Sequence, residues 1–148
     1  MSALENKSVA AKISALENYL YAVEKYLSNK NKDLDDAHLK VVQALRRVMD
    51  ASPENAKNAK KADIHLYNCI KKETDCIRCV ESAEKRVEDA QKKMSKFVKR
   101  LTGVHKTTVV EALVVSYWNI KEAIKWIEQL HFTNPHIIHQ TKVLWEKT

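Results

Sequence analysis

The stretch that decides the fold is residues 53–101, PENAKNAKKADIHLYNCIKKETDCIRCVESAEKRVEDAQKKMSKFVKRL. It contains no glycine, and its only proline is its first residue. Small and apolar side chains recur at alternating steps of three and four, which is typical of a helix that buries one seam against a partner helix. The pattern predicts one long helix from about Pro53 to about Arg100. Its seam positions are Ala59, Ala62, Leu66, Cys69, Glu73, Cys76, Val80, Ala83, Val87, Ala90, Met94, Phe97 and Leu101.

Glu73 is the only charged residue in this seam. Three explanations stay open: it marks where a partner helix ends, it pairs with a lysine or arginine, or it is a buried acid with a raised pKa. The cysteines are expected to be free, buried thiols. His65, Cys69, Cys76 and Cys79 share one stripe, but His65 and Cys79 lie about 21 Å apart along the axis. One zinc ion cannot bind both, so no metal site is expected.

The preceding chain is expected to form two further helices. Apolar residues from Val9 to Leu27 follow the same steps, and Ser2 with Glu5 has the spacing of a capping box at the helix start. The polar residues 28–32 are expected to end this first helix.

A second helix is expected from Asp33 to Ala51, after which Ser52 would cap the long helix and Pro53 would open it. Its buried stripe is predicted to be Leu34, Val41, Leu45 and Val48. Residues 1–93 are therefore predicted to form an all-α region of long helices. Either they fold within one chain as a helical hairpin or three-helix bundle, or they form an intermolecular coiled coil.

Residues 94–148 are predicted to form a small helical module with an extra terminal helix. Gly103 is the only glycine in the chain, and it stands where a helix must stop and the backbone needs a positive φ. Asn119 is a natural N-cap. Helices are expected over about 107–116, 120–131 and 135–147.

Within this module, residues 94–131 resemble a ubiquitin-associated (UBA) domain. The resemblance rests on the loop Thr102-Gly103-Val104, Ala112-Leu113 in the second helix, Asn119 in the turn, and Ala123 with the bulky pair Trp126-Ile127 in the third helix. It implies a three-helix fold that binds a protein partner, with ubiquitin as one candidate. The implied contact residues are Thr102, Gly103, Val104, Ile127 and Leu130.

Two aromatic residues, Tyr117 and Trp118, replace the small turn usual in that family. Trp118 is therefore a further candidate contact residue, either for a partner or for the last helix. That last helix carries Val143 to Lys147, a Trp-led segment that, after a UBA-like bundle, resembles the C-terminal interaction region of Rap1-type telomere proteins.

The chain has 148 residues and a formal net charge of +7, which suits an acidic partner. The alternative function is therefore a basic nucleic-acid- or chromatin-associated factor. Its candidate phosphate contacts are Lys85, Lys92, Lys96 and Lys99, which fall on one side of the long helix. The competing interpretation is a solvated helical surface, because acidic residues are interspersed among the lysines.

No sequence signature of catalysis is present: there is no P-loop, nucleophile elbow or His-Glu-x-x-His motif. His131, His136 and His139 cluster near Asn134-Pro135 and are expected to be exposed polar residues. We expect no catalytic residue and no cofactor. Three cysteines without a secretory signal or an apolar span predict an intracellular protein, cytoplasmic or nuclear, away from membranes. The favoured function is a non-enzymatic adaptor that assembles through its helices, with itself as a homo-oligomer or with a protein partner.

Overall fold

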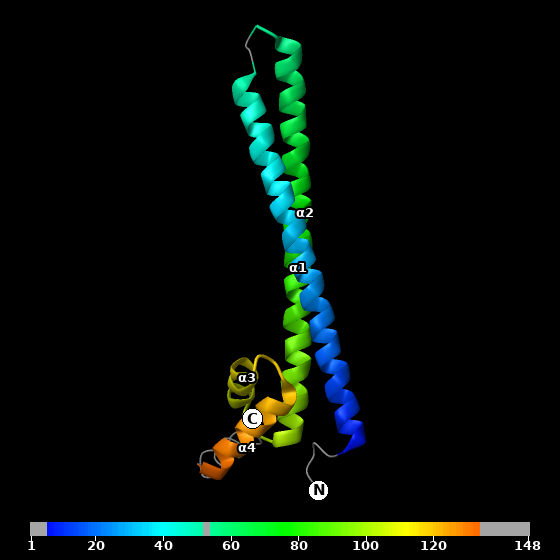
Figure 1. The fold of residues 1–148 in the computed structure, drawn as a ribbon, viewed down its shortest axis with the longest axis vertical. Coiled ribbons are helices and arrows are strands. Elements are labelled where there is room, and N and C mark those ends of the chain that lie inside the picture. Colours follow the sequence, from blue (N-terminus) through cyan, green and yellow to red (C-terminus); the bar gives the residue numbers. More distant parts are fainter. Residues whose placement is uncertain (1–5, 52–53, 134–148) are drawn as a thin grey trace. The chain divides into compact units, whose positions relative to one another are not determined.

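The computed structural model describes residues 6–51 and 54–133, with side chains as far as residue 130. Helix α1 spans Lys7–Asp50, α2 spans Ala56–Thr102, α3 spans Lys106–Val115 and α4 spans Ile120–Thr133 (Figure 1). These described ranges contain no strand, which confirms the predicted all-α fold. None of their helices has an apolar stretch that would cross a bilayer. The helix predicted over 135–147 lies outside the described residues.

Helix α2 confirms the seam that its sequence predicts. Every predicted seam position from Ala59 to Leu101 is buried or half-buried, and the residues between them are mostly exposed. The helix begins later than predicted, because Asn55 takes the N-cap position and its Oδ1 accepts a hydrogen bond from the Asn58 amide at 3.2 Å. Ser52 and Pro53, which were expected to cap and open the helix, lie outside the described residues.

Helix α1 corrects the prediction of two helices separated at residues 28–32. The stretch is helical throughout, since serine, asparagine and lysine cost less than about 0.7 kcal/mol each in a helix and no glycine or proline interrupts it. The seam also keeps its phase there, because Leu27, Lys30 and Leu34 are three and four residues apart and all half-buried.

Because the seam continues in phase past residue 32, the buried residues between 33 and 51 differ from those predicted. Ala37 and Ala44 are 3% and 1% exposed, so two small side chains occupy the seam. Leu45, which was predicted to be buried, is 46% exposed. At the start of α1 the Asn6 Oδ1 accepts a hydrogen bond from the Ser8 amide at 2.9 Å. The capping box predicted from Ser2 and Glu5 falls outside the described residues.

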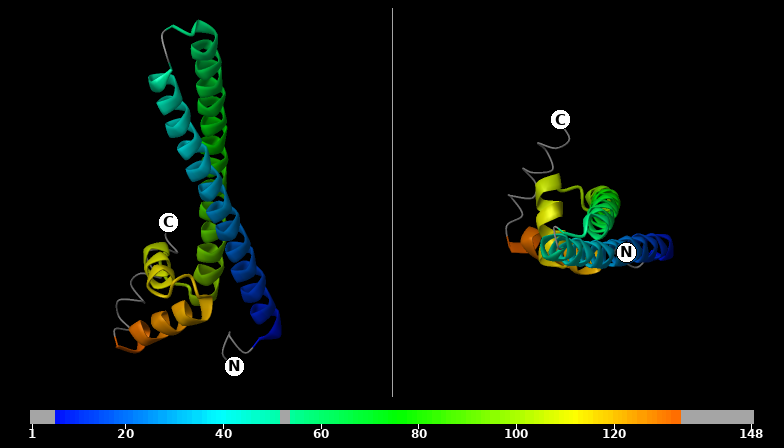
Figure 2. Two further views of the ribbon diagram at one scale, coloured as in Figure 1. Left: turned by 45° about the horizontal axis from the view of Figure 1, so that its top comes forward. Right: turned by 90° about the horizontal axis from the view of Figure 1, so that it is seen from above.

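The chain forms two compact units. The hairpin unit, residues 23–87, contains the second part of α1 and the first part of α2, which lie side by side (Figure 2). The composite unit contains residues 1–22 with 88–148, that is, the start of α1, the end of α2, and both short helices. The division predicted from the sequence, 1–93 and 94–148, stays a prediction.

The composite unit is built around fully buried side chains of α3 and α4. Leu113 and Ile120 are both 0% exposed, and Ala112 and Ala123 are small enough for the two helices to approach closely. The core residues of this unit at or below 3% exposure are Ile13, Ala90, Met94, Val98, Val104, Val109, Ala112, Leu113, Ile120, Ala123, Ile124 and Ile127.

Two side-chain oxygens, one from an amide and one from a carboxylate, bind backbone N–H groups in the first turn of α4. Asn119 Oδ1 accepts a hydrogen bond from the Glu122 amide at 3.0 Å, which confirms Asn119 as the N-cap. Glu17 Oε1, from α1, accepts a hydrogen bond from the Ile120 amide at 3.0 Å. A carboxylate at this end also interacts favourably with the helix dipole, so Glu17 ties α1 to α4.

Candidate interaction surfaces

The residues that the UBA resemblance assigns to ubiquitin do not form one exposed surface. Val104 is 1% and Ile127 is 3% exposed, so both side chains fill the core of the composite unit. This corrects the expectation that these two residues present an apolar patch. Thr102 turns its hydroxyl back onto α2, where Oγ1 donates to the Val98 carbonyl at 2.8 Å.

The loop after α2 explains why Val104 points inward. Gly103 has a φ of 69°, which confirms the positive φ expected there, and its amide donates to the Lys99 carbonyl at 2.8 Å. This left-handed residue ends α2 and turns the chain, so the next side chain enters the core. Of the remaining predicted contact residues, Leu130 and Trp118 are both half-buried.

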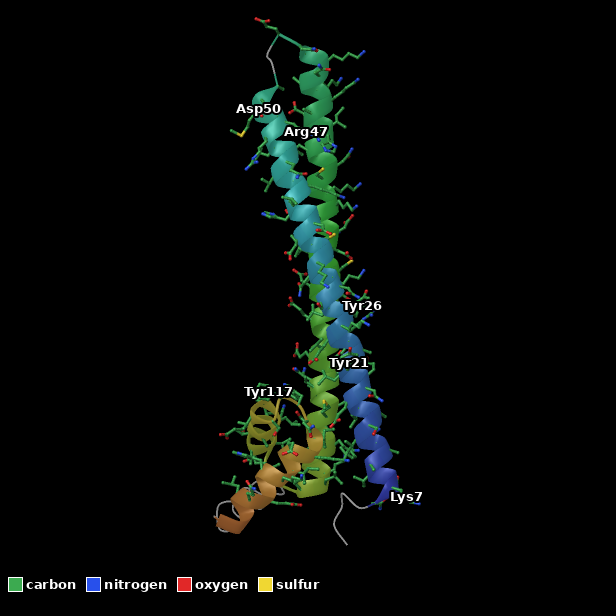
Figure 3. The ribbon with its side chains drawn as sticks, in the orientation of Figure 1. Lys7, Tyr21, Tyr26, Arg47, Asp50 and Tyr117 are labelled. Atoms are coloured by element: carbon green, nitrogen blue, oxygen red, sulfur yellow. The ribbon has the colours of Figure 1, made fainter. Side chains whose placement is uncertain are left out.

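The turn between α3 and α4 is a Schellman motif with an unusual residue at its left-handed position. The Trp118 amide donates to the Leu113 carbonyl at 2.7 Å, and the Tyr117 amide donates to the Val114 carbonyl at 3.1 Å. Tyr117 and Trp118 have φ values of 53° and 61°, where glycine is normally favoured. Tyr117 is also 93% exposed, so core packing gives no reason for an aromatic residue there (Figure 3).

Replacing Tyr117 with glycine is therefore expected to raise the free energy of unfolding of the composite unit by about 1 kcal/mol. Glycine adopts the left-handed conformation without steric strain, and an exposed aromatic side chain contributes little burial. Urea unfolding monitored by circular dichroism measures the change. A Tyr21→Gly variant is the control, because Tyr21 is exposed within a helix and glycine should destabilise it there. A loss of stability in Tyr117→Gly would show that the tyrosine ring is held by contacts.

Three of the four predicted phosphate-contact lysines come together in the composite unit. Lys92, Lys96 and Lys99 line one pocket on α2, and Lys106 of α3 joins them. Lys85 belongs to the hairpin unit and does not line this pocket. The spacing of the lysines along the helix predicted their common side, whereas Lys106 became part of the group only because α3 folds over α2.

The pocket, which we call the lysine pocket, has a volume of about 370 Å³ and mostly apolar walls. Trp118 and Val110 supply apolar surface, and four lysines line the pocket with them. The lining residues are Glu88, Gln91, Lys92, Ser95, Lys96, Lys99, Lys106, Val110 and Trp118.

The electrostatics of the lysine pocket are strongly positive on one side. Partial desolvation, followed by repulsion from Lys106 and Lys96, lowers the pKa of Lys99 from its usual value. The opposite side is closer to neutral, because Lys92 Nζ pairs with Glu88 Oε1 at 3.1 Å. Such a crowd of cations favours an anionic group at the mouth of the pocket.

A second surface lies on one side of the hairpin unit. With the seams of α1 and α2 at heptad positions a and d, Tyr26 and Arg86 both fall at position g. Their 4.8 Å cation–π contact places the g positions of the two antiparallel helices on the same side. The e positions therefore share the other side.

That other side carries exposed apolar residues from both helices, at positions e and b. His38 Nδ1 contacts Glu73 Oε2 at 2.7 Å, and this contact fixes the register of the two antiparallel helices. Residues 42–49 of α1 accordingly lie beside residues 62–69 of α2. We call this surface the apolar flank: Leu45, Met49, Tyr67, Ile70 and Ile77, which are 40–76% exposed.

The same contact resolves the role of Glu73. Its partner is His38 of α1, so Glu73 pairs with a histidine, which is none of the three explanations left open by the sequence. The cysteines also differ from the prediction, since Cys79 is exposed and Cys69 and Cys76 are only half-buried. Among the described residues, no three side chains of metal-binding type converge. The side chains of His131, His136 and His139 lie outside them.

Comparison of the chain with protein-family models, with curated proteins and with solved structures finds no match.

Proposed function

We propose that this protein is a non-enzymatic adaptor whose hairpin unit binds an amphipathic helix of a protein partner along the apolar flank. One observation carries the proposal: Leu45, Met49, Tyr67, Ile70 and Ile77 are exposed on the same side of the hairpin. Clustered, exposed apolar side chains are characteristic of protein contact surfaces, whereas scattered ones need no explanation.

The spacing of the exposed residues on α2 supports a helix as the occupant. Tyr67, Ile70 and Ile77 stand at the b and e positions of α2, and all three are apolar and exposed. Residues at these spacings lie along one face of a helix. A partner helix with an apolar stripe of its own would cover them by packing side by side with α2.

Five partly exposed apolar side chains suit a moderate interaction. Full burial of a large apolar side chain contributes about 1.5–3 kcal/mol relative to exposure. Association and side-chain ordering oppose this by several kcal/mol. The flank alone therefore suits a reversible adaptor contact, with Tyr67 as its largest aromatic anchor.

Site-specific photo-crosslinking in cells tests the proposal. A benzoylphenylalanine in place of Tyr67 is expected to crosslink to one protein partner, through a segment with apolar residues at helical spacing. The matched control carries the same group in place of Tyr21, since Tyr21 and Tyr67 are 68% and 67% exposed. Equal crosslinking from both positions, crosslinking only between copies of this chain, or no crosslinking at all would overturn the proposal.

A second pair of variants separates the apolar flank from general surface effects. Ile70→Lys is expected to reduce crosslinking from position 67 by roughly tenfold, because it places a charge within the buried contact. Asn68→Lys adds the same charge at an exposed position pointing away from the flank and should leave crosslinking unchanged. Equal losses in both variants would count against the apolar flank as the contact surface.

Ubiquitin is not proposed as this partner, because Val104 and Ile127 are core residues. The nucleic-acid alternative has one feature in its favour, the lysines that meet at one pocket. A phosphate-binding protein loses affinity steeply as salt rises, whereas an apolar contact does not. The salt dependence of the crosslinked complex therefore distinguishes the two functions.

A further inference from the structure

The lysine pocket combines two properties that an ordinary solvated surface does not bring together. Trp118 and Val110 give it apolar walls around a volume of about 370 Å³, within the range of sites that enclose a bulky group. Lys96, Lys99 and Lys106 stand at the same pocket, close enough that the cations repel one another. A complementary ligand therefore needs an apolar part and a negative charge beside it.

We propose that the lysine pocket binds an acidic peptide segment of a protein partner, with one bulky apolar side chain in the pocket and flanking carboxylates on Lys96 and Lys106. This is a second contact, additional to the apolar flank, and it does not depend on the proposed function of the hairpin unit.

The charges favour carboxylates at two of the four lysines. Lys92 is already paired with Glu88 at 3.1 Å, so a further carboxylate gains little there. Among the described residues, Lys96 and Lys106 form no ion pair, and both are exposed. A carboxylate between them would offset the repulsion that they exert on Lys99.

The shape of the pocket favours a peptide over nucleic acid. Phosphate contacts along a strand need cations spread over an extended surface, whereas Lys96, Lys99 and Lys106 gather at one pocket. Single-stranded nucleic acid also needs several aromatic platforms, whereas the described residues that line this pocket include one aromatic side chain, Trp118. A phosphorylated side chain would place its charge inside the pocket, where the walls are mostly apolar.

Fluorescence anisotropy with the full chain tests the proposal. The probe is a short fluorescein-labelled peptide with one leucine flanked by aspartates and glutamates. Three comparison probes accompany it: the same peptide with serine for leucine, the same peptide with one phosphoserine, and a single-stranded oligothymidine. We expect the leucine peptide to bind most tightly, and roughly tenfold more tightly than the serine peptide.

Two double charge-reversal variants with the same net charge show where the peptide binds. The double variant Lys96→Glu, Lys106→Glu is expected to bind the leucine peptide at least tenfold more weakly. Lys12→Glu with Arg100→Glu makes the same charge change at exposed positions that do not line the pocket, and it should have a much smaller effect. Circular dichroism confirms that each variant is folded, and Trp118→Leu checks the apolar wall without any change of charge.

Each other outcome overturns the proposal in a distinct way. Equal affinity for the leucine and serine peptides would indicate a merely charged surface. Tighter binding of the phosphopeptide or the oligothymidine would assign the pocket to phosphate. Equal losses in the two charge-reversal pairs, or no peptide binding at millimolar concentration, would remove the site altogether. NMR titration of the Lys99 amino group gives a direct readout, because a bound carboxylate should raise the pKa of Lys99.

Discussion

Replacing Leu113 with alanine is expected to lower the free energy of unfolding of the composite unit by about 2–5 kcal/mol. Leu113 is 0% exposed, and it lies in α3 beside Val109 and Ala112, which are also fully buried. Removal of its side chain leaves a cavity, because a close-packed core relaxes only partly to fill it. The backbone carbonyl of Leu113 also anchors the Schellman turn, and that hydrogen bond is retained in the variant.

The adjacent Val114→Ala change is the matched control, because Val114 is 56% exposed on the same helix. We expect it to alter the free energy of unfolding by less than about 0.5 kcal/mol. Urea unfolding gives the overall change, and amide hydrogen exchange assigns it to α3 and α4 instead of the hairpin unit. Similar effects from the two substitutions would mean that α3 packs loosely, and the lysine pocket would then lack a fixed wall.

The seam of α2 could be predicted because its physical signal is local and long. Thirteen seam positions, from Ala59 to Leu101, follow one phase without interruption, and every one is buried or half-buried. The same periodic pattern continues through α1, but the polar composition of residues 28–32 led to the prediction of a helix end there. Lys30 held the phase there, since its aliphatic chain can fill a seam position while its amino group lies 5.2 Å from the Tyr26 ring.

The candidate surfaces could be predicted only where they depend on one helix. The spacing of Lys92, Lys96 and Lys99 placed them on one side of α2, and they share a pocket. Lys106 and Trp118 reach that pocket through the folding of α3 and its turn, which helix periodicity does not encode. The burial of Val104 could not be predicted either, because an apolar residue after Gly103 suits an exposed patch and a core equally well. The left-handed turn at Gly103 directs the Val104 side chain into the core.

An Asn29→Pro substitution is expected to lower the free energy of unfolding by at least about 3 kcal/mol, because proline inside a helix removes a hydrogen bond and clashes with the preceding turn. Asn29 lies within α1, on its exposed side, so proline at this position affects only the backbone and buries nothing. Urea unfolding and the loss of helical circular dichroism measure the effect.

The same substitution separates a continuous α1 from two helices joined by a linker. In a linker, proline would be tolerated and would stabilise the fold by about 0.4–1 kcal/mol through the unfolded state. The expected signs are therefore opposite, and the difference between them is several times the uncertainty of the measurement. Asn29→Ala completes the comparison, since alanine has the higher helix propensity and should stabilise a continuous helix by up to about 0.7 kcal/mol. Destabilisation by proline together with stabilisation by alanine would establish that α1 carries the seam without a break through residues 28–32. Tolerance of proline would instead indicate two helices joined by a linker, as the sequence predicted.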